Sequence, residues 1–372
     1  MTSVDVQIRG TGAVACSLAL ALGPTGLRVA LSAAREHAGE PDVRAYALNA
    51  ASRTLLARLR VWEALPRDAV TPVYDMRIEG DAAGSLLEFS AWQQCTDALA
   101  WIVDAAALDA ALADALRFAS HVQRSDADLG APLTVLAEGK ASAARAALGV
   151  TFERHAYGQT AVAARLTSDR PHDGVAYQWF RSPDVLALLP FDRPAAGHSC
   201  GLVWSLPDER ARALLAMAPD AFEAELQSAS AGLCGHLRLA SARAAWPLAI
   251  AKADRICGPG WALAGDAAHV VHPLAGQGLN LGLADVASLV TVLASREAWR
   301  GVGDERLLRR YARERAGPTQ AMAHLTDALL HTFAHDRPLL RELRNRGLTL
   351  LNHAAPAKRW LAARALGHRG IP

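Results

Sequence analysis

The alternation of apolar and polar residues near the amino terminus predicts a strand, a helix and a second strand in quick succession. Residues 4–8 (Val-Asp-Val-Gln-Ile) alternate between the two kinds of side chain, which is typical of a short strand. Residues 13–22 are rich in alanine and leucine and favour a helix. A second apolar run at 27–31 favours another strand. Elements in this order build the parallel sheets of α/β proteins.

A glycine motif lies between the first strand and the helix. Gly10-Thr-Gly12-Ala-Val-Ala15 has the G-x-G-x-x-A form of a dinucleotide-binding turn, in the strand-to-helix context that such a turn requires. Gly10 permits the tight turn, Gly12 lets the backbone approach a pyrophosphate, and Ala15 still allows close packing of the helix. We therefore expect a dinucleotide-type cofactor at the carboxyl end of the first strand.

A second stretch, 258–280, changes from strand to loop to helix. Residues 261–264 form a short apolar run bounded by glycines, and Gly265-Asp266 places a carboxylate at its carboxyl end, where open α/β sheets bind their ligands. From Gly276 onward apolar residues recur every three or four positions, which predicts a helix with one buried face: Leu279, Leu283, Val286, Val290 and Leu293. Gly276 and Gly278 leave the start of this helix bare, so its N–H groups can approach an electron-rich ligand atom.

Two further segments, 73–103 and 151–239, are β-rich and predict a separate antiparallel sheet. They consist of short apolar runs with partial alternation and aromatic residues. Four of their residues are candidates for the lining of an apolar pocket: Trp179, Leu188, Pro190 and Trp204. An ordinary sheet core explains each of these residues, taken singly, at least as well.

Composition narrows the class of protein. A chain of 372 residues has room for about two domains, and 51% hydrophobic with 20% charged residues is typical of a globular enzyme. The net charge of +2 leaves no overall footprint for nucleic acid. Five scattered cysteines without a C-x-x-C pair argue against a disulfide framework, and we assign no metal site to His269 and His272 because no further ligand is spaced with them. We find neither a signal peptide nor a transmembrane run, and expect a cytoplasmic protein.

The 258–280 stretch also carries a specific family resemblance. Gly265-Asp266-Ala-Ala-His269 followed by Pro273-Leu-Ala-Gly276-Gln277-Gly278-Leu279-Asn280 resembles the second flavin motif of class A aromatic hydroxylases, and is most similar to the ubiquinone-biosynthesis hydroxylases. The resemblance implies that Asp266 holds the ribityl chain of FAD. It also implies that the helix start lies by the pyrimidine edge of the isoalloxazine.

The same resemblance extends to Asp42-Val-Arg44-Ala-Tyr-Ala-Leu48, and it implies that Arg44 lies along the FAD. A guanidinium suits this place because it offers a planar fork of donors to anionic oxygens. The alternative is a surface arginine paired with Asp42.

The fold that the resemblance implies is α/β, with a Rossmann-like FAD-binding domain, an inserted antiparallel β-sheet substrate domain and a C-terminal helical region. We assign 1–72, 104–150 and 240–300 to the FAD-binding domain, 73–103 and 151–239 to the substrate domain, and 301–372 to the helical region. The tail beyond 335 is basic and leucine-rich, so it either lies on an anionic membrane surface at the inner face of the membrane or packs as a solvated helix on the core.

Three positions depart from the family pattern. Ser32 stands where the family has a glutamate that accepts hydrogen bonds from the adenosine ribose, Ala105 replaces a polar cofactor contact, and Glu138 replaces an aspartate. An ionised acceptor contributes about 1.5–3 kcal/mol against about 1 kcal/mol for a neutral one. We therefore expect adenosine binding to be weaker by about ten- to thirtyfold.

The resemblance implies an FAD-dependent monooxygenase that hydroxylates an aromatic ring, with a polyprenylated phenol of ubiquinone biosynthesis as the substrate. In that chemistry reduced flavin takes up O₂ to give a C4a-hydroperoxide, so we assign no catalytic acid or base. The electron source is NAD(P)H or a partner reductase. The rival interpretation is a non-catalytic scaffold homologue among other ubiquinone-biosynthesis proteins, which the three departures favour.

Overall fold

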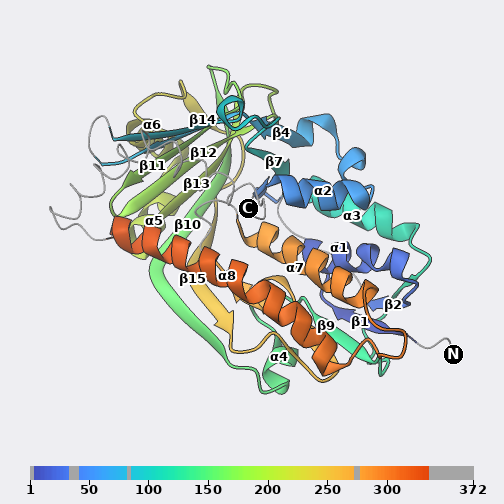
Figure 1. Cartoon of the computed structure of the whole chain (residues 1–372). Helices are drawn as coiled ribbons and strands as arrows, with labels where there is room; N and C mark the ends of the chain where they lie inside the picture. Colours follow the sequence, from blue (N-terminus) through green and yellow to red (C-terminus); the bar gives the residue numbers. More distant parts are fainter. Residues whose placement is uncertain (1–3, 33–41, 82–84, 272–276, 335–372) are drawn as a thin grey trace.

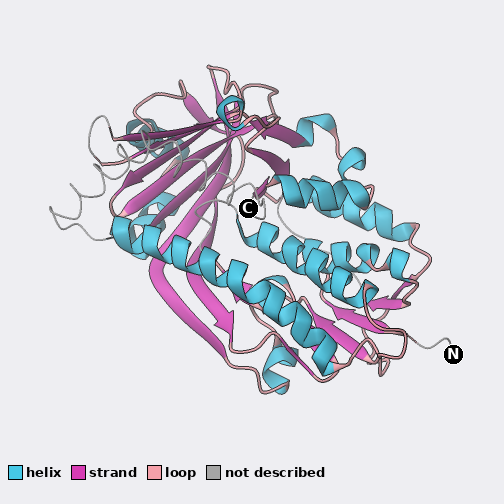
Figure 2. Ribbon diagram, in the orientation of Figure 1, coloured by secondary structure: helices cyan, strands magenta, loops and turns pink. Residues whose placement is uncertain are grey.

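The computed structural model describes residues 4–32, 42–81, 85–271 and 277–334. Within these ranges the strands form three sheets, and the long helix α8 (Glu305–Ala334) runs across the molecule in front of two of them (Figure 1). Figure 2 shows most of the other helices on one side and the longest strands on the other. None of the helices in these ranges combines the length and the apolar character that crossing a bilayer requires.

The parallel sheet has the strand order β16-β17-β9-β1-β2-β8. Its members are β1 (Val6–Arg9), β2 (Val29–Leu31), β8 (Val122–Arg124), β9 (Leu133–Leu136), β16 (Cys257–Gly258) and β17 (Trp261–Leu263). Except for β16 and β17, neighbouring strands run in parallel, so their carboxyl ends share one edge. Gly10 and Asp266 follow β1 and β17, and the two cofactor motifs therefore meet at this edge.

Helices α1 (Ala13–Ala21), α3 (Ala105–Arg117) and α7 (Gln277–Ala294) pack on the parallel sheet. The predicted apolar face of α7 is confirmed, because Leu283, Val286 and Leu293 are each at most 1% exposed. Helix α8 adds Tyr311, which is fully buried and donates a hydrogen bond to the Leu263 carbonyl at 2.8 Å. The core of this half is thus built from segments far apart in the chain.

The large sheet has the order β18-β15-β10-β13-β12-β11-β5-β6, with β14 paired to β10. Its members are β5 (Asp75–Glu79), β6 (Leu86–Ser90), β10 (Phe152–Ser168), β11 (Val175–Arg181), β12 (Asp184–Phe191), β13 (Ser199–Pro207), β14 (Leu237–Leu239), β15 (Ala244–Ala253) and β18 (His269–Val270). Neighbours pair antiparallel except β5 and β11. Helices α5 (Asp208–Ala216) and α6 (Pro219–Ala229) pack on one face.

A small antiparallel sheet joins the two halves. It consists of β3 (Ala45–Leu48), β7 (Ala100–Asp104) and β4 (Val70–Val73) in that order. Helix α2 (Ala50–Arg58) follows β3 in the sequence, and the short helix α4 (Ala143–Ala147) follows β9. Val73 and Ile102 of this sheet share an apolar cluster with Phe191 of β12. The small sheet therefore packs on the face of the large sheet that α5 and α6 leave open.

Two strands fall across the domain limits that the sequence led us to expect. β15 lies after residue 239 but pairs with β10, so the large sheet continues into the segment assigned to the FAD-binding domain. β7 lies within 73–103 for most of its length but pairs with β3 and β4 rather than with the large sheet. Of the predicted C-terminal region, 335–372 is outside the described residues.

The predicted pocket lining needs correction. Trp179, Leu188 and Trp204 are each 1% exposed and belong to the core cluster under α5 and α6, and Pro190 is buried on the same side of β12 as Leu188. Leu188 also borders a cavity of only about 20 Å³. A period of two identifies the two faces of a strand, but it does not say which face receives the helices. These residues therefore fix α5 and α6 to the sheet.

Candidate cofactor site

The turn after β1 has the geometry of a phosphate cradle. Gly10 has a φ of 136°, and a Cβ atom there would lie 2.3 Å from the Ala137 carbonyl oxygen. Gly12 is the residue before the first turn of α1, where no side chain caps the helix and a Cβ atom would meet nothing within 4 Å. The amino end of α1 therefore presents its N–H groups to open space, as binding of a pyrophosphate requires. Ala15 is fully buried, which agrees with its predicted packing role.

Two glycines that pack against Val14 bring the two cofactor motifs together. Gly265 has a φ of 62°, and a Cβ atom on it would lie 3.2 Å from Val14 of α1. A Cβ atom on Gly282 of α7 would lie 2.5 Å from the same valine and 3.3 Å from the Gly265 Cα. Helix α1, helix α7 and the end of β17 therefore meet at a point where larger side chains do not fit. This contact holds the Gly12 turn beside Asp266.

Asp266 sits in the short helical turn η5 (Gly265–Ala267) directly after β17. Its side chain is half-buried, and the described residues give its carboxylate no hydrogen-bond partner. Burial raises the pKa of Asp266, while the charges of Lys140 and His269 oppose the rise. A partly desolvated carboxylate of this kind favours hydroxyl donors, and the ribityl chain of a flavin supplies such donors.

A buried ionic cluster fixes the backbone next to Asp266. The Asp285 carboxylate is fully buried and accepts hydrogen bonds from the Gly265 N–H at 2.9 Å, from His269 Nε2 at 2.8 Å and from Arg315 Nε at 2.6 Å. Burial alone would raise the pKa of Asp285, but His269, Arg315 and the Gly265 N–H outweigh it and hold this pKa below its usual range. Burial likewise disfavours the His269 cation, yet Asp285 raises the pKa of His269 overall. The cluster thus ties β17, β18, α7 and α8 together.

The start of α7 divides into open and structural positions. At Gly278 a Cβ atom would meet nothing within 4 Å, so this position is open to a ligand. Asn280 is structural: its Oδ1 accepts hydrogen bonds from the Asn49 N–H at 3.0 Å and the Ser52 hydroxyl at 2.7 Å, and its Nδ2 donates to Ala47 O at 2.7 Å. It positions α7 against β3 and α2, a role the sequence did not reveal.

For four other residues of this motif a contact with the cofactor stays a prediction. Leu279 is partly buried against the core of the parallel sheet. Gln277 begins α7, and Pro273 and Gly276 lie outside the described residues.

Ser32 at the end of β2 supports the glycine turn. Its hydroxyl accepts a hydrogen bond from the Gly10 N–H at 3.3 Å, and its carbonyl accepts one from Arg124 Nη1 at 2.9 Å. The hydroxyl is therefore already engaged in the protein. A cation now lies next to the position where the family pattern has a glutamate.

Arg44 adopts the alternative that the sequence left open. Its guanidinium forms a two-point pair with Asp42, with Nε to Oδ1 at 2.9 Å and Nη2 to Oδ2 at 2.6 Å. The hydrogen bonds that its guanidinium donates to the Asp42 carboxylate raise the pKa of Arg44. Its carbonyl accepts a hydrogen bond from Arg165 at 2.6 Å. A role of Arg44 toward FAD stays a proposal.

Arg145 supports the turn that carries Asp266, a role that the sequence did not reveal. It is 6% exposed, donates to the carbonyls of Ala267 and Lys140 at 2.9 Å each, and stacks on Phe152 with 3.5 Å to the ring centroid. The Ala267 contact anchors η5 next to Asp266. Glu138 accepts a hydrogen bond from Ser142 Oγ at 2.5 Å and helps to form this loop.

Arg165 is a second residue that sequence reasoning missed. It is 7% exposed on β10 and donates to the Arg44 carbonyl and, at 3.3 Å, to Asp104. Its guanidinium lies 3.8 Å from the Phe191 ring centroid, and Nη1 has no partner among the described residues. An arginine inside the apolar run Ala161-Val-Ala-Ala-Arg165 was the available signal.

Together, the open amino end of α1, the carboxylate after β17 and the bare start of α7 define a flavin-binding protein of the α/β class. The chain matches the FAD binding domain family over residues 115–326 and belongs to that family. It is an FAD-dependent monooxygenase of the aromatic-hydroxylase type. FAD fits the described residues, because the glycine cradle is open and Asp266 is available.

Two relatives and one solved structure illustrate the similarity. The chain is 31% identical to 3-demethoxyubiquinol 3-hydroxylase of Escherichia coli, covering 98% of both chains. It is 29% identical to the ubiquinone hydroxylase UbiL of Rhodospirillum rubrum, covering 98% of this chain and 89% of the relative. In fold it resembles P. aeruginosa PqsL in complex with 2-aminobenzoylacetate, with a TM-score of 0.76, 22% identity, and coverage of 94% of this chain and 100% of PqsL.

Proposed function

We propose that this protein hydroxylates the ring of a polyprenylated phenol on the route to ubiquinone. Two relatives that match nearly the whole chain, a ubiquinone hydroxylase and a 3-demethoxyubiquinol 3-hydroxylase, support the substrate class. The observation that carries the proposal is the junction of Val14, Gly265 and Gly282, since it holds the glycine turn and Asp266 next to each other, as binding of one FAD molecule by both would require.

In this proposal the chain binds FAD in an extended form along the edge of the parallel sheet. The amino end of α1 takes the pyrophosphate and Asp266 accepts hydrogen bonds from the ribityl hydroxyls. Ser32 and Arg44 lie toward the adenosine side, and Gly278 lets the α7 amino end approach the pyrimidine edge. When bound, FAD supplies the activation of O₂. The protein holds the flavin, orients the substrate ring and excludes water.

The aromatic ring belongs on the face of the large sheet opposite α5 and α6. Leu189 and Phe191 of β12 lie on this face, next to the small sheet and to Ala45 and Ala47 of β3. Asn280 joins β3 to the start of α7, so this face adjoins the flavin side of the molecule. Arg165 stacks on Phe191 there and limits how far a ring can enter.

An isotope experiment tests the proposal. The FAD-loaded protein is given a prenylated phenol, NAD(P)H or a flavin reductase, and ¹⁸O₂, and the product is analysed by mass spectrometry. Incorporation of one ¹⁸O atom into the ring is the expected result. A product that carries oxygen from water, or no product with either electron source, would refute the proposal.

The rival interpretation, a non-catalytic scaffold, rests on the engaged Ser32 hydroxyl and disagrees with the hydroxylases to which the chain is similar. Such a protein would fold without FAD and would not respond to added FAD. A titration of the apo-protein with FAD, followed by flavin fluorescence, separates the two functions.

Peripheral membrane contact through the basic residues after 335 is a further part of the proposal, and cosedimentation with vesicles that contain anionic lipid tests it.

A further inference from the structure

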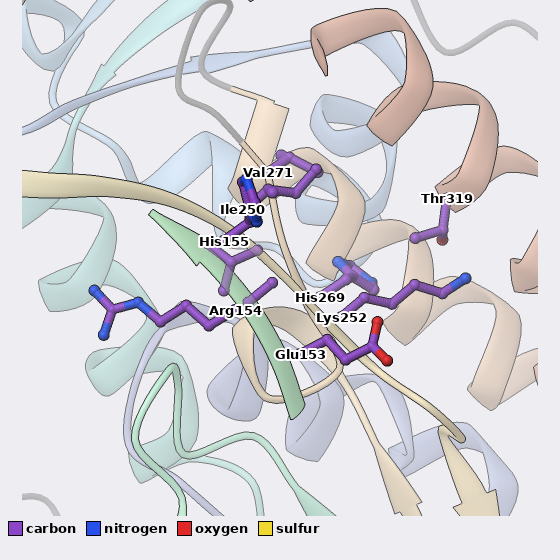
Figure 3. Close-up of a pocket in the computed structure, with 10 residues that line it drawn as sticks. Glu153, Arg154, His155, Ile250, Lys252, His269, Val271 and Thr319 are labelled. Carbon is purple, nitrogen blue, oxygen red and sulfur yellow. The ribbon is translucent and has the colours of Figure 1, made fainter. Parts of the chain in front are cut away.

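A cavity of about 420 Å³ lies between the edge of the large sheet and α8. Of the residues described for the cofactor site, His269 alone lines it. Its volume falls within the range of about 300–1,000 Å³ that is typical of small-molecule sites. The lining residues come from β10, β15, the β18 segment and α8: Glu153, Arg154, His155, Ile250, Ala251, Lys252, His269, Val270, Val271 and Thr319. Figure 3 shows these side chains around the space.

A polar row crosses three strands at one end of the cavity. Glu153 of β10 pairs in register with Lys252 of β15, and Lys252 pairs with His269 of β18. Paired residues share a face of a sheet, so the three side chains point the same way. The neighbouring row contains His155 paired with Ile250. The cavity therefore has a charged end and a more apolar end.

Thr319 of α8 adds an unused donor. The residue is 6% exposed, and its hydroxyl has no hydrogen-bond partner among the described residues. A buried hydroxyl without a partner costs about 1–3 kcal/mol, so such groups are kept where a ligand or water completes them. Figure 3 shows the Lys252 side chain reaching toward the same side as Thr319, whereas Arg154 extends the opposite way.

His269 supplies the third polar group. Its Nε2 bonds to Asp285 at 2.8 Å, which leaves the Nδ1 side of the ring for the cavity. Behind it, Asp285 is paired with Arg315 as well, so the buried cluster does not carry a negative charge toward the cavity. Glu153 beside Lys252 keeps the net positive charge of this end small.

We propose that this cavity is a second small-molecule site that binds an organic monocarboxylate with an apolar body. Lys252, Thr319 and His269 take the carboxylate, and Ile250 and Val271 contact the apolar part. A phosphate dianion suits the site less, because Glu153 offsets the Lys252 charge. The site is separate from the proposed flavin cradle, since Gly12, Asp266 and Gly278 do not line it.

Titration calorimetry with benzoate tests this site on the full chain loaded with FAD. We expect benzoate to bind, benzyl alcohol and inorganic phosphate to bind at least about tenfold more weakly, and Lys252→Gln and Thr319→Val to weaken benzoate binding by about three- to tenfold each. Arg154→Gln is the matched control, because it removes an equal charge from the same strand pair while the Arg154 side chain extends away from Lys252 and Thr319. Its benzoate affinity is expected to stay within about twofold of the parent.

The variants also separate this cavity from the hydroxylation site. Lys252 is exposed and Thr319→Val keeps the side-chain shape, so both proteins should fold, as circular dichroism would verify. Benzoate binding that is unchanged in both variants would place the ligand elsewhere and overturn the proposal. Absence of benzoate binding to the parent protein, or equal loss in Arg154→Gln and Lys252→Gln, would overturn it as well.

Discussion

Replacing Asp285 by asparagine removes the charge that joins α7, α8 and the backbone before Asp266. Asp285 and Arg315 have side chains that are 0% and 5% exposed, with 2.6 Å between Oδ1 and Nε. Removal of one member of a buried pair leaves the other charge without compensation and costs about 3–5 kcal/mol. An asparagine keeps the shape and part of the hydrogen bonding, so we expect Asp285→Asn to lower the free energy of unfolding by about 3 kcal/mol.

Urea unfolding of the apo-protein at neutral pH measures this loss. Glu305→Gln is the control, since Glu305 pairs with Arg309 on the surface of α8 with side chains 38% and 62% exposed. An exposed pair contributes about 0–1 kcal/mol, so this control should change little. The double variant Asp285→Asn with Arg315→Met removes both charges and should regain about 1–2 kcal/mol relative to Asp285→Asn alone.

The reasoning fails if Asp285→Asn is no more damaging than Glu305→Gln. It fails equally if the double variant loses the full sum of the two single losses, because then Asp285 and Arg315 are not coupled. A weaker affinity for FAD in Asp285→Asn is a second expected effect, since the Gly265 N–H would lose its charged acceptor beside Asp266.

Three further changes test other parts of the structure. Gly10→Ala places a Cβ atom 2.3 Å from the Ala137 carbonyl and should reduce stability by about 1–3 kcal/mol and weaken FAD binding, as urea unfolding and FAD titration would show; unchanged values would contradict the cradle. Ser32→Glu restores an ionised acceptor beside Arg124 and should tighten FAD binding about tenfold over Ser32→Ala, measured by flavin fluorescence. Equal affinities of the two variants for FAD would show that residue 32 does not contact the adenosine. Burial raises the pKa of Asp184 to about 6, although the charge of Arg210 opposes the rise. The folded protein therefore holds this proton more tightly than the unfolded chain, and the stability that the protonated carboxyl contributes at low pH is lost as the pH rises from about 4 to 6. Over that interval the free energy of unfolding of the parent should fall by about 2 kcal/mol more than that of Asp184→Asn, a figure that allows for the half-exposed Arg210. Equal pH dependence of the two proteins would contradict this prediction.

Local sequence was sufficient for the elements whose geometry depends on neighbouring residues. The strand, glycine turn and helix from Val6 to Ala21 form where expected, because the turn needs only glycines between two short elements. Asp266 follows β17 for the same reason. The apolar period over α7 also predicted the buried face correctly.

Contacts between distant segments could not be predicted in this way. Trp179 and Trp204 face α5 and α6, and only the packing of those helices decides which face of the sheet is covered. Asn280 lies within the flavin motif, yet its side chain bonds to Asn49 and Ser52, which are remote in sequence. The partners of Arg165, which are the Arg44 carbonyl just before β3 and Asp104 of β7, are likewise set by tertiary structure.

The most direct test of the account is the binding of FAD to the purified protein and to Asp266→Ala, measured by equilibrium dialysis and visible absorption. We predict one FAD per chain in the parent protein and an affinity about tenfold or more lower in Asp266→Ala, because the carboxylate supplies the charged acceptor for the ribityl hydroxyls. A parent protein that stays colourless at saturating FAD, or an Asp266→Ala variant that binds FAD as tightly as the parent, would contradict the account.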